Sequence, residues 1–245
     1  MKYGIQMYLL RDKCKTKEQT LQTLKALADM GWDGIELFQG IDIPAAEIRS
    51  AVGNCDILNP MLWSKNFESK KIQKTCDWLK ALGAKEAAYN VLPILLYNER
   101  NYRKFNAKYQ KIAPVMAQNG LCFCHHNHKE DYLIKAGKAG IDILLNGVNP
   151  YCLEIDTYWA LAAGRDVTAL MEERREHLRY IHLKDKKAGA KTFCPLGEGD
   201  VDNRAYVEKA VEMGLEYVIV DLDSSDCDVF EAAKKSLAWL RKNFG

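Results

Sequence analysis

The stretch Thr16–Phe38, TKEQTLQTLKALADMGWDGIELF, contains the pattern that decides the fold. Thr16 and Gln19 have the spacing of a helix-capping box, and apolar residues then recur at helical intervals. Gly31 marks the expected end of this helix. The apolar run Gly34–Phe38 follows at once and predicts a strand, so the stretch is one helix-to-strand unit of a parallel sheet.

The same alternation of short apolar runs and longer helical patterns continues along the chain. Further helices are predicted over Ile72–Leu82, Asn98–Gln118 and Arg204–Met213, each followed within two residues by a glycine. The predicted strands are Tyr3–Met7, Gly34–Phe38, Asp56–Met61, Glu86–Asn90, Leu121–Asn127, Tyr151–Asp156, Tyr180–Leu183 and Tyr217–Asp221.

Eight such strands fit either an open doubly wound sheet or a closed barrel. A doubly wound sheet usually has a glycine-rich phosphate loop after its first strand, and residues 7–12, MYLLRD, contain no glycine. No linker or change in composition divides the chain. We therefore predict an α/β fold, a (β/α)8 TIM barrel, as a single domain over residues 1–245.

The bulk composition is that of an ordinary globular enzyme. Of 245 residues, 48% are hydrophobic and 28% are charged, and the net charge of +2 is spread without a basic stripe. No apolar stretch approaches the roughly 20 residues of a membrane span, and the start of the chain resembles a strand more than a signal peptide. We expect a cytoplasmic protein with reduced cysteines that binds neither nucleic acid nor membranes, and we leave open whether it forms a homo-oligomer.

The active site of such a barrel lies at the carboxyl ends of its strands. The polar residues at or just after the predicted strand ends are Glu36, Asn90, His126, Asn127, His128, Asp156, His182, Lys184, Asp185, Asp221 and Asp223. His126 and His128 share one strand face because side chains alternate with a period of two. Imidazole and carboxylate groups from separate strands together form the kind of cluster that binds Mn, Zn, Co or Mg.

Each of these residues also has a purely structural interpretation. Asp156 could serve only as the N-cap of the following helix. His182 could be a buried histidine with ordinary hydrogen-bond partners, and the same holds for His126 and His128. The cluster as a whole therefore supports the metal site more strongly than any single member does.

Several longer motifs add a resemblance to a known family. They are residues 27–37 (LADMGWDGIEL), His126-Asn-His128, Glu154-Ile-Asp156-Thr-Tyr-Trp159 with residues 163–166 (AGRD), His182-Leu-Lys-Asp185, residues 196–199 (LGEG), and residues 217–223 (YVIVDLD). Over nearly its whole length the chain resembles the xylose isomerase-like superfamily of barrels. That superfamily includes sugar phosphate isomerases, ketose epimerases, inosose dehydratases and endonuclease IV.

The resemblance implies a divalent metal held by a carboxylate after strand five, Asp after strand six, His after strand seven and Glu after strand eight. Asp156 and His182 match this pattern, whereas His126 and Asp221 stand where the family usually has carboxylate and Glu. The resemblance thus gives His126, Asp156, His182 and Asp221 as metal ligands.

Epimerases of this kind move a proton across a planar enediolate with the carboxylates after strands five and eight. The expected acid and base groups here are Asp221, His126 and His128, although Asp221 is one methylene shorter than Glu. Glu36, Asn90, Trp159 and Lys184 are expected to bind substrate without ligating metal.

The resulting hypothesis is a metal-dependent isomerase or epimerase that acts on a sugar or ketosugar. One alternative is a dehydratase or lyase that acts on a polyol or ketosugar through the same enolate chemistry. A second is a catalytically impaired barrel of this fold that binds a sugar or a partner, because the family glutamates are absent. DNA repair of the endonuclease IV kind would require more than the five histidines present.

Overall fold

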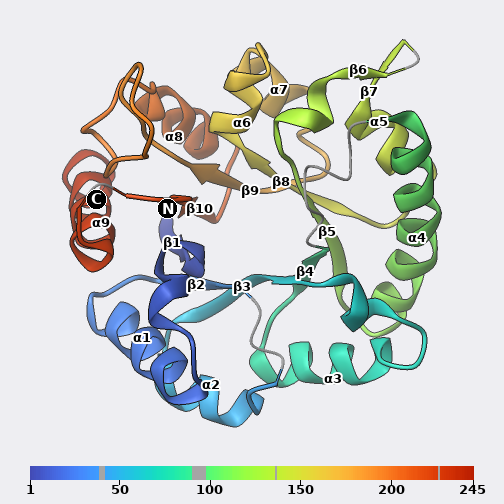
Figure 1. Ribbon diagram of the computed structural model, residues 1–245, viewed down its shortest axis with the longest axis horizontal. Coiled ribbons are helices and arrows are strands. Elements are labelled where there is room, and N and C mark those ends of the chain that lie inside the picture. Colours follow the sequence, from blue (N-terminus) through green and yellow to red (C-terminus); the bar gives the residue numbers. More distant parts are fainter. Residues whose placement is uncertain (39–41, 90–97, 136, 226) are drawn as a thin grey trace.

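The computed structural model describes residues 1–38, 42–89, 98–135, 137–225 and 227–245, and these form the predicted barrel. Eight parallel strands close on themselves in the order β1-β10-β9-β8-β5-β4-β3-β2. Figure 1 shows the strands at the centre and the helices around them. The strands are β1 (Lys2–Gln6), β2 (Gly34–Phe38), β3 (Asp56–Leu62), β4 (Glu86–Tyr89), β5 (Cys122–His126), β8 (Cys152–Asp156), β9 (Leu178–Leu183) and β10 (Tyr217–Val220).

The main helices connect consecutive strands and cover the outside of the barrel. They are α1 (Lys17–Asp29), α2 (Ala45–Val52), α3 (Ile72–Leu82), α4 (Glu99–Gln118), α5 (Gly140–Leu145), α6 (Thr157–Ala162), α7 (Val167–Glu173), α8 (Asn203–Glu212) and α9 (Val229–Phe244). The predicted capping box of α1 is confirmed: the Thr16 side chain accepts from the Gln19 backbone N–H, and the Gln19 side chain accepts from the Thr16 backbone. No helix in the described part of the chain is both long and apolar enough to cross a membrane.

Predicted and observed strands agree to within one or two residues. β9 begins at Leu178, earlier than the apolar pattern indicates, because exposed Arg179 interrupts that pattern. A short hairpin of β6 (Ile134–Lys135) and β7 (Lys138–Ala139) was not predicted, because two-residue strands are too short to show alternation. Asn90, the predicted end of the fourth strand, lies outside the described residues.

Two apolar clusters fill the inside of the barrel. One consists of Leu58, Tyr180, Tyr217 and Ile219, and the other of Met61, Ala88, Cys124 and Cys152. Gly34 on β2 leaves room for the first cluster, because a Cβ added there would lie 2.6 Å from Leu58 Cδ1. The interior is therefore packed below the site and is not a pore.

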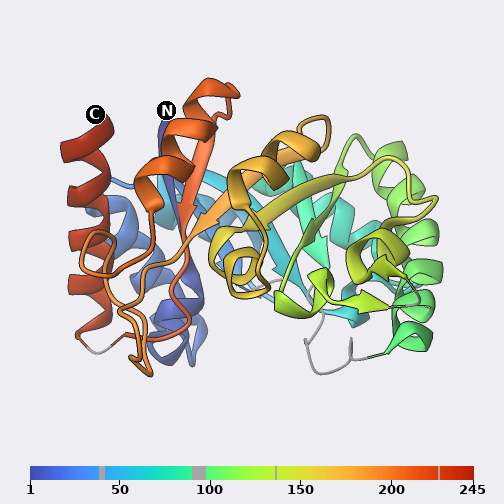
Figure 2. The ribbon, with the colours of Figure 1, turned by 90° about the horizontal axis from the view of Figure 1, so that it is seen from above.

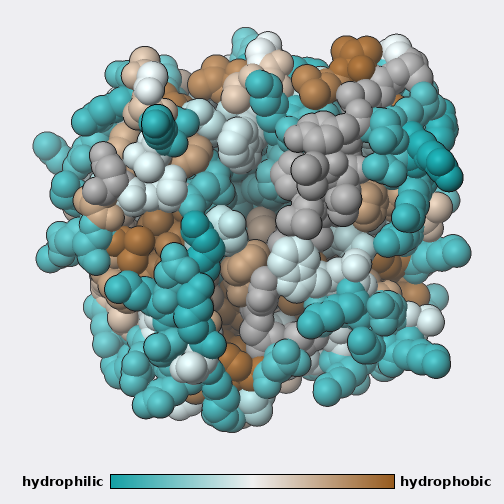
Figure 3. Space-filling view, viewed as in Figure 1, coloured by the Kyte–Doolittle hydropathy of each residue, from teal (hydrophilic) through white to brown (hydrophobic). Residues whose placement is uncertain are grey.

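The inward faces of the strands become polar toward the carboxyl ends. On β10 the inward residues run from Tyr217 through Ile219 to Asp221, which directly follows the strand. On β9 they run from Tyr180 to His182. In Figure 2 the loops that follow the strands gather at the end of the barrel opposite the amino terminus. Figure 3 views the molecule from the same side as Figure 1 and shows a hollow near the centre of that face.

Candidate metal centre

The period-two alternation of the strands brings several polar side chains together inside the barrel mouth. Glu154 and Asp156 both point inward from β8, because they are two residues apart. His182 and Lys184 have the same spacing at the end of β9. Glu36, Glu154, Asp156, His182 and Lys184 are all completely buried. Buried ionisable groups at this density require paired charges or a bound ion.

The four expected metal ligands lie close to one another. His126, Asp156, His182 and Asp221 each offer one ligand atom, and these atoms all lie within 4.8 Å of one another. His182 Nδ1 is 3.1 Å from Asp221 Oδ2, and His126 Nε2 is 4.0 Å from Asp156 Oδ2. Two ligands on opposite sides of one ion are about 4 Å apart when each bond is about 2 Å long. The limit of 4.8 Å exceeds this by less than 1 Å, so small side-chain movements would bring the four atoms around a single divalent ion.

Asp156 divides its two carboxylate oxygens between a structural and a possible ligand role. Its Oδ1 accepts the backbone N–H of Trp159 at 2.9 Å and caps α6, so the alternative interpretation as an N-cap is correct for that oxygen. Its Oδ2 lies 3.2 Å from the Lys184 ammonium, and Asp221 Oδ1 has no hydrogen-bond partner among the described residues. A buried acceptor without a donor is costly, and a divalent cation between the two carboxylates would satisfy both oxygens. The donor set therefore fits a divalent metal.

Asn127 holds the end of β8 in place from the neighbouring strand. Its side-chain oxygen accepts the Asp156 N–H at 2.9 Å, and its side-chain nitrogen donates to the Asp156 carbonyl at 3.3 Å. The alternation of β5 thus sends Asn127 toward the backbone of β8, while His126 points into the mouth. His125 points away from the mouth and lies 3.3 Å from Asp131.

Glu36 and Gln6 form a chain of hydrogen bonds behind His182. Gln6 Nε2 donates to Glu36 Oε1 at 2.7 Å, and Glu36 Oε2 is 2.8 Å from His182 Nε2. If Nε2 carries the proton that Glu36 accepts, the lone pair of Nδ1 is free on the side of Asp221. Carboxylates commonly orient metal-binding histidines in this way. Glu36, an expected substrate-binding residue, is thus placed beneath the ligand and does not line the cavity.

The buried groups Glu36, Glu154 and His182 shift one another's pKa values. Burial, and then the negative charge of Glu154, raises the pKa of Glu36 well above its usual range. Burial opposes the charged form of His182, but Glu154 and Glu36 outweigh it and raise the pKa of His182. Glu154 lies 3.2 Å from His182 Nε2 and 3.3 Å from His126 Nδ1. The carboxyl groups of Glu154 and Glu36 therefore favour the protonated, positively charged form of His182.

Lys184 places an ammonium group among the carboxylates at the mouth. Its Nζ contacts Asp221 Oδ2 and lies 3.2 Å from Asp156 Oδ2 and 3.5 Å from Asp223 Oδ2. Burial opposes the charge of Asp221, but Lys184 and then His182 hold the pKa of that carboxyl below its usual range. Lys184 was expected to contact substrate, but it does not line the cavity in this structure.

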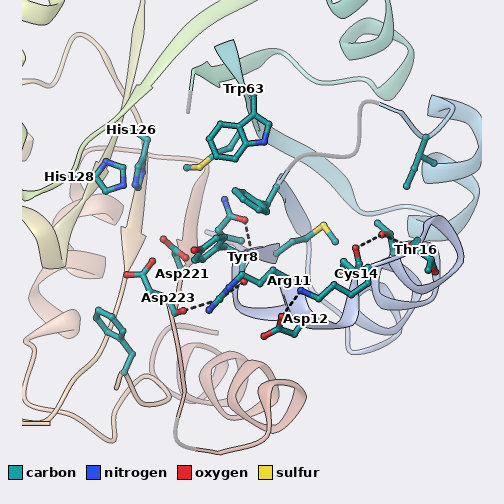
Figure 4. Close-up of a pocket in the computed structure, with 18 of the residues that line it drawn as sticks. Tyr8, Arg11, Asp12, Cys14, Thr16, Trp63, His126, His128, Asp221 and Asp223 are labelled. Carbon is teal, nitrogen blue, oxygen red and sulfur yellow. Dashed lines mark hydrogen bonds and ion pairs between the residues drawn. The ribbon is translucent and has the colours of Figure 1, made fainter. Parts of the chain in front are cut away.

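The site opens into a cavity of about 1070 Å³. Figure 4 shows His126 and His128 on one side of it and Asp221 and Asp223 together on another. The rings of His126 and His128 meet edge to face with centroids 5.0 Å apart. Burial, and then the neighbouring His126, lowers the pKa of His128 to about 3, so its imidazole is neutral at ordinary pH.

Aromatic side chains form much of the cavity wall. Trp159 on α6, expected to bind substrate, lines the cavity together with Phe193. Trp63, which follows β3, and Tyr8, in the 3-10 helix Met7–Lys13, also line it. Flat apolar rings suit the carbon-bound faces of a sugar. Arg11 joins two elements of the wall, because its Nη1 donates to the Tyr8 and Asp223 carbonyls at 2.9 Å each.

Glu154 and Gln6 belong to the site and were not singled out from the sequence. Glu154 lies inside a strand and not at its end, so a search restricted to strand ends passes over it. The available signal was its spacing of two from Asp156, which puts both carboxylates on one face. Gln6 ends β1 and carries no charge, and only the structure reveals its contact with Glu36.

The fold and the polar barrel mouth define a TIM-barrel protein with a candidate metal centre at the carboxyl ends of its strands. A family model for the xylose isomerase-like TIM barrel matches residues 24–243. The chain belongs to this family, and the resemblance noted in the sequence is confirmed. A search among curated proteins gives no match.

Solved structures of similar shape agree with this assignment. A sugar phosphate isomerase/epimerase from Parabacteroides distasonis is 21% identical with a TM-score of 0.78, over 98% of this chain and 93% of that one. The 3-keto-D-glucoside 4-epimerase from E. coli is 18% identical with a TM-score of 0.71, over 99% of both chains. The IOLI protein with a bound zinc atom is 15% identical with a TM-score of 0.69, over 100% of both chains. At these identities the likeness establishes the fold.

Proposed function

We propose that this protein is a metal-dependent isomerase or epimerase that acts on a sugar or ketosugar. The observation that carries the proposal is the group His126, Asp156, His182 and Asp221, whose ligand atoms lie within 4.8 Å of one another and include oxygens of two buried carboxylates. The large cavity beside Asp221 and His126 gives a substrate access to that group. A soluble sugar or polyol is the partner that such a cavity suits.

The names of structural neighbours support the same choice. Two are described as a sugar phosphate isomerase/epimerase and a 3-keto-D-glucoside 4-epimerase, and a third contains zinc. A bound Mn, Zn, Co or Mg ion would polarise a substrate carbonyl and stabilise the negative charge of an enediolate. The choice among these metals depends on the ligand atoms, and imidazole with carboxylate accommodates all four.

The residues of this chain supply orientation and proton transfer. Glu36 and Gln6 hold the imidazole of His182, and Asn127 holds the backbone of Asp156. His128 and Asp223 follow different strands, line the cavity and lie outside the ligand group. His128, expected with Asp221 and His126 as an acid/base group, and in addition Asp223 are therefore candidates to accept and return a proton. Trp159 provides an apolar face for the sugar ring.

Hydrogen exchange in D2O tests the proposal. The protein is stripped with EDTA and incubated with a panel of ketoses, with and without Mn²⁺, and deuterium at the carbon beside the carbonyl is measured by mass spectrometry. We expect exchange and a second sugar product only when the metal is present. The Asp221→Asn variant is the control for background exchange.

Other outcomes separate the alternatives. Loss of water from the substrate with formation of a double bond would identify a dehydratase or lyase. Exchange that EDTA does not affect would contradict the metal dependence. Thermal stabilisation by a sugar, with no exchange on any member of the panel, would identify a binding protein of this fold.

A further inference from the structure

The side chain of Lys184 is completely buried inside the barrel mouth. Lysine is almost never fully buried unless its ammonium is paired, because removing that charge from water is costly. Here it has three carboxylates, those of Asp156, Asp221 and Asp223, at contact or near-contact distance. Lys184 is therefore an integral part of this acidic site.

The ammonium uses the same oxygens that a metal would use. Lys184 Nζ contacts Asp221 Oδ2, which also lies 3.1 Å from His182 Nδ1. It is 3.2 Å from Asp156 Oδ2, which also faces His126 Nε2. A divalent ion bonded to these two oxygens at about 2 Å would lie next to the ammonium, and two cations repel strongly at such a distance.

A second position for the ammonium is available within the same site. Asp223 Oδ2 lies 3.5 Å from Lys184 Nζ and has no hydrogen-bond partner among the described residues. The ring of Phe193 is 5.8 Å from the same nitrogen, within the range of a cation–π contact. Asp223 and Phe193 both line the cavity, so a small displacement toward them would keep the ammonium paired.

We propose that Lys184 is a tethered cation that occupies the metal position in the metal-free protein, and that a divalent ion binds by displacing its ammonium from Asp156 and Asp221 toward Asp223. The inference rests on the proposed metal site and adds a competitor to it. Lys184 keeps the carboxylates together without metal, lowers the affinity for metal, and lies beside the substrate cavity once the metal is bound.

Metal affinity measured on matched variants tests the competition. Free Mn²⁺ is measured by electron paramagnetic resonance during titration of the wild type, Lys184→Met and Lys186→Met, because Mn²⁺ prefers oxygen and imidazole ligands to the thiols of the eight cysteines. Lys184→Met should bind Mn²⁺ at least about tenfold more tightly, an effect in the range ordinarily seen for changes next to a metal site.

Lys186→Met is the control for a general loss of positive charge. Lys186 lies two residues further along and lines the same cavity, but its ammonium lies over the rings of Tyr158 and Phe193, and no carboxylate lies within 4.0 Å of it in the described part of the chain. Its removal should alter Mn²⁺ affinity much less than the removal of Lys184. Equal tightening in both variants would contradict a specific competition.

A measurement on the wild type covers the case in which Lys184→Met does not fold. Protein labelled with ¹⁵N-lysine is titrated with diamagnetic Mg²⁺, at concentrations that displace bound Mn²⁺, and the ammonium signal of the buried lysine is followed by NMR. Displacement predicts a large change in its shift and faster exchange of its protons with water. An unchanged signal in metal-saturated protein would overturn the inference.

The outcomes also separate this inference from the proposed function. Mn²⁺ binding by the wild type with no tightening in Lys184→Met and no change at the ammonium signal overturns the inference and leaves the metal enzyme intact. Binding only by Lys184→Met would show that a divalent ion does not displace the lysine in the wild type, which overturns the displacement and contradicts the metal dependence of the proposed function. Absence of binding in both proteins contradicts the metal site, and the metal dependence of the proposed function with it.

Discussion

Asp221 carries a carboxylate that His182 and Lys184 both contact. Asp221→Asn keeps the size of the side chain and removes the charge, so we expect Mn²⁺ affinity to fall by tenfold or more and ketose exchange to fall with it. Titration with Mn²⁺ and the deuterium assay check the two effects. Asp12→Asn is the matched control, because Asp12 also lines the cavity but pairs with Lys15 and lies outside the ligand group. Similar losses in both variants would show that the charge matters without direct ligation.

Glu36 is proposed as a positioning residue that acts through His182. Glu36→Gln removes the charge that fixes the imidazole, and we expect metal affinity to fall by about 10–100-fold. In Mg²⁺-saturated protein, where Nδ1 must be unprotonated to bind metal, the ¹⁵N shifts of the His182 ring should show loss of a single Nε2–H tautomer, which a merely structural change would not produce. Glu47→Gln on exposed α2, where Glu47 pairs with Lys17, should change neither quantity. A normal tautomer in Glu36→Gln would contradict the role.

Glu86 predicts a pH dependence of stability that is separate from the site. Burial raises its pKa to about 7 from an ordinary 4.5, and the Tyr180 hydroxyl donates to it. A raised carboxyl pKa favours the folded state below pH 4.5, and this contribution is lost as the pH rises from about 4.5 through 7. At pH 8 the charged group costs up to about 3 kcal/mol, at 1.36 kcal/mol for each pKa unit.

Glu86→Gln should remove this cost. Urea unfolding at pH 5 and pH 8 should show that the variant is more stable than the wild type at pH 8 and loses less stability between the two pH values. In the variant the Tyr180 hydroxyl can still donate to the side-chain amide oxygen at position 86. A difference in stability between variant and wild type would therefore not come from loss of this hydrogen bond. Equal slopes of stability against pH in the two proteins would show that Glu86 titrates at its ordinary pKa.

Individual site residues can be predicted from the sequence where their position on a strand alone determines their place in the site. Alternation and strand ends place Asp156, His182 and Asp221 at a common mouth, since the carboxyl ends of parallel strands meet there. The same rule cannot show that Glu36 turns toward His182 or that Lys184 reaches the carboxylates. Those contacts depend on the tilt and register of strands that are distant in sequence.

At the scale of elements, Asn127 joins the end of β5 to the end of β8. Asn127→Ala leaves the Asp156 N–H without its partner, and a buried unsatisfied donor costs about 1–3 kcal/mol. We expect that loss in urea unfolding, together with weaker Mn²⁺ binding because Asp156 loses its support. Asn98→Ala removes the N-cap of α4 at a cost of about 1 kcal/mol and should leave Mn²⁺ affinity unchanged. If Mn²⁺ binding weakened in both variants, the weakening would be a consequence of lower overall stability and not of the lost support of Asp156.

Elements with regular patterns were predictable, and irregular ones were not. Helix α3 has the predicted bounds, because apolar spacing defines it and Gly83 ends it in a left-handed conformation. The region between β5 and β8 contains a 3-10 turn, the β6–β7 hairpin and the short helix α5. None of these is long enough to repeat a period, so tertiary contacts determine them.

The barrel as a whole depends on close packing of its interior around Gly34. Gly34→Ala would place a Cβ 2.6 Å from Leu58 Cδ1, and such overpacking costs about 1–3 kcal/mol. The same Cβ would lie 2.8 Å from Leu58 Cγ, and Leu58→Ala removes both of these carbons. The double variant Gly34→Ala/Leu58→Ala should therefore be more stable than the sum of the two single effects predicts, as measured by urea unfolding. Strict additivity would show that the new methyl group is accommodated elsewhere.

Closure of the barrel joins the two ends of the chain, because Lys2 on β1 pairs with Tyr217 on β10. During synthesis, β1 leaves the ribosome long before its partner exists. At the usual 5–20 residues per second, the open edge of β1 waits on the order of ten seconds or more for β10. An unpaired strand edge is a template for association with other chains. Newly made molecules should therefore be most prone to aggregate, and most dependent on chaperones, in the interval before the last strand emerges.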